Sequence, residues 1–135
     1  MRTRALIAGV VATTALAGCG DDPEKRIDTQ QIRQVVTDFA AADGPQACEF
    51  LTPDAVVNVY GGFTRPFRVS HAECVRRSKR FKGERIELGQ IEVVDDASVR
   101  IGAKNSDQTV SYNVKVVRFG NKWLIDKINQ SRITE

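Results

Sequence analysis

Three cysteines and one histidine carry the most distinctive side-chain chemistry of this 135-residue chain: Cys19, Cys48, Cys74 and His71. Thiolates and imidazoles are the usual ligands of structural zinc, and such sites commonly include two cysteines separated by two to four residues. This sequence contains no such pair, and His71 supplies the only imidazole. We therefore expect no metal site and no cofactor.

The first cysteine follows an apolar run at the start of the chain. Arg2 and Arg4 precede thirteen uncharged residues, 5–17. A helix needs about 20 apolar residues to span a bilayer, so this run is short for a membrane anchor. Its length and its basic start are typical of a secretory signal peptide.

The segment Leu16-Ala17-Gly18-Cys19 resembles the lipobox of bacterial lipoproteins. The resemblance implies that residues 1–18 are removed and that Cys19 receives fatty acyl chains such as palmitate. Residues 19–26 are then a polar tether, and 27–135 form the domain. The expected location is the extracytoplasmic face of the cell membrane. The alternative is an ordinary signal peptide with a coincidental cysteine.

Removal of residues 1–18 changes the charge balance of the chain. The loss of Arg2 and Arg4 lowers the 20 basic residues to 18, against 17 acidic residues. The remaining net charge of +1 gives no sign of nucleic-acid binding, and we expect none.

The other two cysteines then form an even pair outside the cytoplasm, where disulfides persist. A bridge between Cys48 and Cys74 closes a loop of 27 residues. We expect this disulfide rather than metal binding.

The first half of the domain has a helical pattern. Asp28 and Gln31 resemble a capping box, and apolar residues then recur at helical spacing until a helix end near Ala42. These residues are Ile32, Val35, Val36 and Phe39.

Three further helices follow in the prediction. One covers residues 45–51, and the next starts at Thr52-Pro53 and ends at Gly61-Gly62. Residues 63–69 form a short strand or a loop. Ser70 to Glu73 reads as a capping box that starts the last helix, with Cys74 on its inner face.

The second half alternates apolar and polar residues, which is typical of strands. We expect strands over residues 86–94, 98–104, 110–116 and 122–128, with Gly89 at a bulge. Helices followed by consecutive antiparallel strands indicate an α+β fold.

This order of elements, ending in Gly-Asn-Lys-Trp-Leu-Ile, is similar to the nuclear transport factor 2-like (cystatin-like) fold. The pair of cysteines resembles that of small actinobacterial lipoproteins of this group. The resemblance implies N-terminal helices packed on a curved four-stranded antiparallel sheet, which together form a cone with an apolar pocket.

The same superfamily includes ketosteroid isomerase and polyketide cyclases, which use a pocket carboxylate as base and a tyrosine or acid as hydrogen-bond donor. The resemblance makes Tyr60, Tyr112 and Asp126 the pocket candidates. No spacing ties them together, and buried tyrosines are commonly core residues. We assign no catalytic residue, and we expect His71 to be a solvent-facing or helix-start residue rather than a ligand or a base.

Charge is unevenly distributed along the domain. Residues 61–85 contain eight basic residues against Glu73 and Glu84, a net charge of +6. The basic residues are Arg65, Arg68, Arg76, Arg77, Lys79, Arg80, Lys82 and Arg85.

Arg76, Arg77 and Arg80 recur at helical spacing, which places them on one outward face. They could contact anionic lipid headgroups or an acidic envelope partner. The alternative is an ordinary solvated helix face.

The sequence therefore predicts a membrane-anchored lipoprotein whose domain is a binding or interaction module for an unidentified ligand. Its expected partners are the membrane and anionic groups, with a homodimer as a further candidate. The alternative function is an isomerase or cyclase of the ketosteroid isomerase type.

Overall fold

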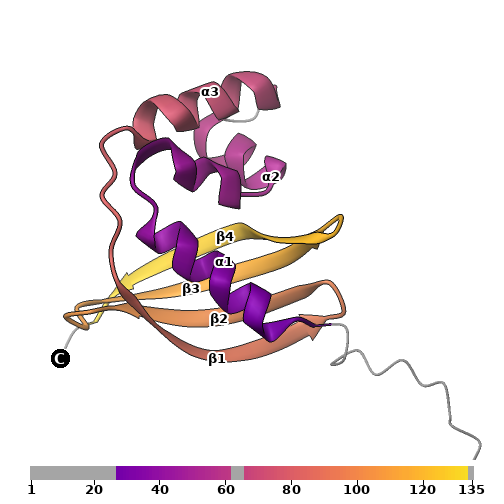
Figure 1. Ribbon diagram of the computed structural model, residues 1–135, viewed down its shortest axis with the longest axis vertical. Helices are drawn as coiled ribbons and strands as arrows, with labels where there is room; N and C mark the ends of the chain where they lie inside the picture. The colour runs from indigo at the N-terminus through magenta and orange to yellow at the C-terminus, as the bar shows by residue number, and fades with distance from the viewer. Residues whose placement is uncertain (1–26, 62–65, 134–135) are drawn as a thin grey trace, which may run out of the picture.

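A four-stranded antiparallel sheet with helices packed against it makes up residues 27–61 and 66–133, the part of the chain that the computed structural model describes (Figure 1). The expected α+β class is confirmed. The proposed signal peptide, the tether and Cys19 lie outside the described residues. Within the two described ranges, no helix has the length and apolar character needed to cross a bilayer.

Helix α1 (Thr29–Ala41) crosses one face of the sheet (Figure 1). Its start agrees with the prediction, because the Asp28 carboxylate accepts a hydrogen bond from the Gln31 amide at 3.0 Å. Ile32, Val35 and Val36 are buried against the strands. Their helical spacing therefore accounts for the way α1 packs.

The sheet is a meander in the order β1-β2-β3-β4. The strands are β1 (Ile86–Asp95), β2 (Ser98–Asn105), β3 (Val110–Phe119) and β4 (Lys122–Arg132). Each expected strand is present, and each is longer than the alternating pattern predicted. The register shifts between Leu88 and Ile91, so the ladder is irregular around Gly89 as expected.

The main core lies between α1 and the sheet. Val99 of β2 pairs with Val116 of β3, which in turn pairs with Ile125 of β4. All three side chains are fully buried. Alternate residues of β2, β3 and the first half of β4 are buried on this face, so the period-2 pattern of these strands defines the core.

The remaining helical segments gather on the β4 side of the sheet (Figure 1). They are the 3₁₀ helix η2 (Gly44–Phe50), α2 (Pro53–Val56), the π-helical turn η3 (Val57–Gly61) and α3 (Phe67–Ser78). Thr52 caps α2 as predicted, since its hydroxyl accepts a hydrogen bond from the Ala55 amide at 3.0 Å. Its own amide donates to the Ile125 carbonyl at 2.9 Å, which fixes this start to the edge of β4.

The start of α3 corrects the prediction. The helix begins at Phe67 after Pro66, so Phe67 to Val69 are helical rather than strand or loop. The capping box at Ser70 to Glu73 is wrong, because Ser70 lies inside the helix and its hydroxyl donates to the Pro66 carbonyl at 3.1 Å. Pro66 supplies a fixed φ next to the first turn, and this restriction suits a helix start.

The predicted disulfide between Cys48 and Cys74 is confirmed and joins η2 to α3. The face that α3 buries consists of small side chains at a spacing of four, namely Ser70, Cys74 and Ser78. Val56 completes this second core beside the bridge. The helical region therefore has little apolar area of its own, and the disulfide is a main source of its stability.

The chain crosses from α3 to β1 over the C-terminal end of α1. The Glu84 amide donates to the Ala40 carbonyl at 2.7 Å, and the Gly83 amide donates to Asp43 Oδ1 at 2.7 Å. A Cβ atom at Gly83 would lie 2.1 Å from the Ala41 carbonyl oxygen. Only glycine permits this approach, because both contacting groups are backbone.

We predict that the double substitution Cys48→Ala and Cys74→Ala lowers the free energy of unfolding by about 3.5 kcal/mol, the chain-entropy value for a loop of this length. Urea unfolding monitored by circular dichroism measures this loss. Reductant should destabilise the wild-type protein by a similar amount and leave the double variant unchanged. Finding Cys48 and Cys74 alkylated without reduction would contradict the prediction.

Candidate functional site

The three pocket candidates occupy two neighbouring hollows on the helix-covered face of the sheet. Tyr60 of η3 and Asp126 of β4 line the same hollow of about 240 Å³. Tyr112 of β3 lines a different cavity of about 180 Å³. Phe39 and Ile128 contribute to both walls and lie between the two spaces.

Asp126 is fully engaged by neighbouring side chains. Its Oδ1 accepts a hydrogen bond from Thr52 Oγ1 at 3.1 Å, and its Oδ2 pairs with Lys115 Nζ at 3.3 Å. Both oxygens thus connect β4 to the start of α2 and to β3. This carboxylate stabilises the fold and is poorly placed to take a proton from a substrate.

Tyr60 is half-buried beside the same hollow. Burial raises the pKa of its hydroxyl, and the Arg77 guanidinium, 5.9 Å from the ring centroid, partly opposes this rise. The tyrosine therefore stays protonated at neutral pH. Its contact with Arg77 links η3 to α3 through a cation–π interaction.

The 180 Å³ cavity lies between the C-terminal end of α1 and the sheet. Its walls are almost entirely apolar, and polar side chains lie on its rim. The lining residues are Val36, Phe39, Ala40, Ala42, Ala47, Phe81, Lys82, Glu84, Ile86, Tyr112, Val114 and Ile128. An apolar space with few polar groups is the usual form of a small-molecule site.

Tyr112 and Glu84 form a hydrogen-bonded pair at this cavity. The Tyr112 hydroxyl donates to Glu84 Oε1 at 2.8 Å. This bond, together with partial burial and the negative charges of Glu84 and Asp107, raises the pKa of Tyr112. Glu84 was not a predicted site residue, since it lies in the crossing segment, 28 positions from Tyr112, where no periodic pattern applies.

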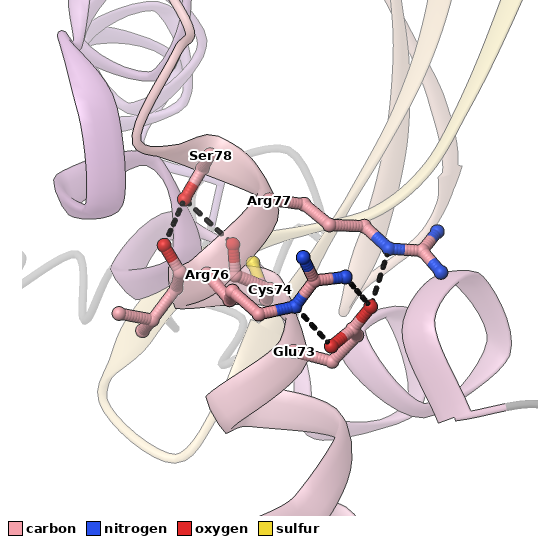
Figure 2. Close-up of polar contacts among 6 residues, drawn as sticks. Glu73, Cys74, Arg76, Arg77 and Ser78 are labelled. Carbon is pink, nitrogen blue, oxygen red and sulfur yellow. Dashed lines mark hydrogen bonds and ion pairs between the residues drawn. The ribbon is translucent and has the colours of Figure 1, made fainter.

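The predicted basic face of α3 contains an ion-pair cluster (Figure 2). Arg76 Nε donates to Glu73 Oε2 at 2.8 Å, and Arg77 Nε donates to Glu73 Oε1 at 2.7 Å. These hydrogen bonds lower the pKa of Glu73 to about 2. The two arginine side chains are 66% and 53% exposed, but they share one carboxylate.

Arg80 does not continue this helical face. Helix α3 ends at Ser78, where the Ser78 hydroxyl donates to the Cys74 carbonyl at 2.6 Å (Figure 2). Arg80 is exposed in the turn that follows, together with Lys79 and Lys82. The predicted set is therefore divided. Arg76 and Arg77 lie on α3 and pair with Glu73, whereas Arg80 lies in the turn after the helix.

His71 lies on α3, 3.6 Å from Glu49 of η2, and its ring contacts Phe67. In the described parts of the chain, no group of three His, Cys, Asp or Glu side chains could hold a metal ion. At the cavity, the apolar walls offer contact to a ligand, and the Tyr112–Glu84 pair offers hydrogen bonding.

Neither the known protein-family models nor the sequences of curated proteins match this chain. The arguments for function accordingly come from the sequence and from the geometry of the cavity and surface.

We predict that Glu84→Gln lowers the pKa of Tyr112 toward its ordinary value of 10.0, because the charged acceptor is removed. The native state holds this proton more tightly than the unfolded state. Its stabilising contribution is thus complete below pH 10 and is lost as the pH rises through the native pKa. Glu84→Gln should reduce that loss.

Tyrosinate absorbance during a pH titration measures the shift, in a Tyr60→Phe background that leaves a single tyrosine. Glu87→Gln, an exposed position on β1, is the matched control and should leave the titration unchanged. An identical titration in the Glu84→Gln protein would show that the pair does not form.

Proposed function

We propose that the protein is a lipid-anchored, extracytoplasmic binding module that holds a small apolar ligand in the 180 Å³ cavity beside α1. The cavity carries this proposal, because its walls are almost entirely apolar and a hydrogen-bonded polar pair lies on its rim. Its size limits the ligand, since an apolar protein cavity of about 150 Å³ accommodates benzene. The ligand is therefore about one ring in size, or a part of that size belonging to a longer molecule.

The Tyr112–Glu84 pair on the rim favours a ligand that donates a hydrogen bond, while Lys82 on the same rim is itself a donor. The Tyr112 hydroxyl already donates its hydrogen bond to Glu84, so the acceptors that remain are the other carboxylate oxygen and the tyrosine lone pairs. A ligand hydroxyl fits this arrangement. An apolar molecule without a donor gains only the contact with the walls.

The finer fold that we propose is the nuclear transport factor 2-like cone. The order of helices and strands, with α1 lying across a meander, supports it. On this proposal the sheet curves around α1, and the apolar cavity beside the helix is the interior of the cone.

An isomerase or cyclase is the alternative function, and the Tyr112–Glu84 pair is the observation in its favour. A catalytic carboxylate near neutral pH needs a desolvated setting that raises its proton affinity. Glu84 is exposed and already accepts a hydrogen bond from the Tyr112 hydroxyl. The raised pKa of Tyr112 also makes it a weaker acid toward a developing oxyanion, so binding is the better supported function.

The proposed anchor rests on Leu16-Ala17-Gly18-Cys19 after a short apolar run. The disulfide between Cys48 and Cys74 supports an extracytoplasmic location, because cytosolic thiols are normally kept reduced. Two acyl chains on Cys19 would hold the domain stably at the membrane.

We predict that the protein takes up labelled palmitate when it is produced in bacteria and that Cys19→Ser abolishes this uptake. Fluorography of the purified protein measures the label. Cys48→Ala is the control for a general effect of cysteine loss and should retain the label. A wild-type protein without label would contradict the lipid anchor.

We predict that phenol binds in the cavity more tightly than benzene, because its hydroxyl donates to the Tyr112–Glu84 pair. Chemical shift changes of the amides around Phe39 and Val114 report this binding by NMR. Ala40→Leu fills part of the cavity and should abolish binding of both molecules.

Ala41→Leu is the matched control, because Ala41 is the neighbouring exposed residue and does not line the cavity. It should bind phenol as the wild type does. Equal binding of phenol by the Ala40→Leu protein would place the ligand elsewhere and overturn the proposal.

A further inference from the structure

A phenylalanine surrounded by cations occupies the turn that follows α3. Phe81 is 49% exposed, and Lys79, Arg80 and Lys82 are all exposed beside it in sequence. We refer to residues 79–82 as the basic turn. Large apolar side chains flanked by lysine and arginine are typical of surfaces that sit in a membrane interface.

The backbone of the basic turn is fixed from two sides. The Phe81 amide donates to the Ser78 carbonyl at 2.9 Å, and the Phe81 carbonyl accepts from the Gly44 amide at 3.1 Å. The phenylalanine is therefore held at the rim of the cavity, with half of its surface in solvent.

The cations of the basic turn differ from those of α3 in their partners. Among the described residues, the side chains of Lys79, Arg80 and Lys82 form no ion pair, whereas Arg76 and Arg77 share Glu73. Among the described residues, the turn therefore presents three cations without a carboxylate partner, whereas Arg76 and Arg77 share one.

Two carboxylates border the basic turn and are already engaged. Asp43 accepts the Gly83 amide at 2.7 Å, and Glu84 accepts the Tyr112 hydroxyl at 2.8 Å. The three cations outnumber these two acids, so the turn keeps a positive potential around an apolar side chain.

We infer that the basic turn docks on the anionic headgroups of a lipid bilayer, with Phe81 inserted into the interfacial region. The inference rests on the proposed membrane anchor. The sequence predicted that Arg76, Arg77 and Arg80 contact anionic headgroups. In the present inference, only Arg80 of these three makes that contact. Three unpaired cations together strengthen association with an anionic surface on the order of 100-fold.

The tether is long enough for this orientation. The chain enters α1 at Thr29, whereas the residues that follow the basic turn contact the other end of this helix, where the Glu84 amide donates to the Ala40 carbonyl. A 13-residue helix is about 20 Å long. The eight residues 19–26 reach at most about 29 Å when extended. The domain can therefore lie with α1 along the bilayer and the basic turn against it.

The test uses the full chain reconstituted in vesicles whose acyl chains carry bromine, which quenches nearby tryptophan fluorescence. Phe81→Trp reports contact with lipid, and the native Trp123 is buried and adds a constant background. We expect quenching in vesicles that contain phosphatidylglycerol and none in phosphatidylcholine vesicles. Lys79→Gln, Arg80→Gln and Lys82→Gln together should abolish it.

Two controls separate docking from attachment. Phe119→Trp replaces a phenylalanine that is 53% exposed, at the end of β3 and between Arg118 and Lys122 in sequence. This end of the sheet lies opposite the end at which the chain enters β1 after the basic turn (Figure 1). The tryptophan at this position should not be quenched. The charge-matched variant Arg100→Gln, Lys104→Gln and Arg132→Gln should retain the quenching of Phe81→Trp.

Flotation of the vesicles at high salt tests the anchor independently. Protein that floats while Phe81→Trp stays unquenched overturns the docking inference and leaves the anchor standing. Quenching of Phe119→Trp in place of Phe81→Trp also overturns it. Protein that fails to float contradicts the lipid anchor. If Phe81→Trp is then still quenched at low salt, the basic turn docks on the bilayer without a lipid anchor.

Discussion

The close passage of the chain over the end of α1 is the constraint on which the rest of this structure depends. The helical segments that follow α1 lie on the β4 side of the sheet, whereas β1 starts at its far edge, so the chain must cross between α3 and β1. It does so with Gly83 against the Ala41 carbonyl and the Glu84 amide bonded to the Ala40 carbonyl. A side chain at position 83 would push this crossing away from α1.

The crossing also builds the candidate site. It holds Glu84 within hydrogen-bond distance of Tyr112 and sets Phe81 at the rim of the apolar cavity. The disulfide fixes the preceding element, because it joins α3 to η2 where small side chains supply little apolar contact. The position of the cavity rim thus depends on Gly83 and on the disulfide between Cys48 and Cys74. Neither of them lines the cavity.

Residues with a regular pattern could be read from the sequence, and residues placed by tertiary contacts could not. Asp28 and Thr52 cap the helices as predicted, and alternating residues of β2, β3 and the first half of β4 are buried in the core. The start of α3 was misread, because its buried face consists of small polar and sulfur side chains, while Phe67 and Val69 are exposed. Hydrophobic periodicity does not detect a face of that kind.

The distribution of surface charge likewise could not be predicted from the sequence alone. A count along residues 61–85 treats every cation alike, but Glu73 reaches Arg76 and Arg77 because residues three and four apart are neighbours on a helix. The helix ends at Ser78, so no helical turn brings Glu84 beside Arg80 four positions earlier, and Glu84 accepts a hydrogen bond from Tyr112 instead. Positive potential is therefore concentrated where the helix stops, beside the apolar rim that Phe81 provides. The end of α3, rather than the number of basic residues, determines where an anionic partner would be attracted to this domain.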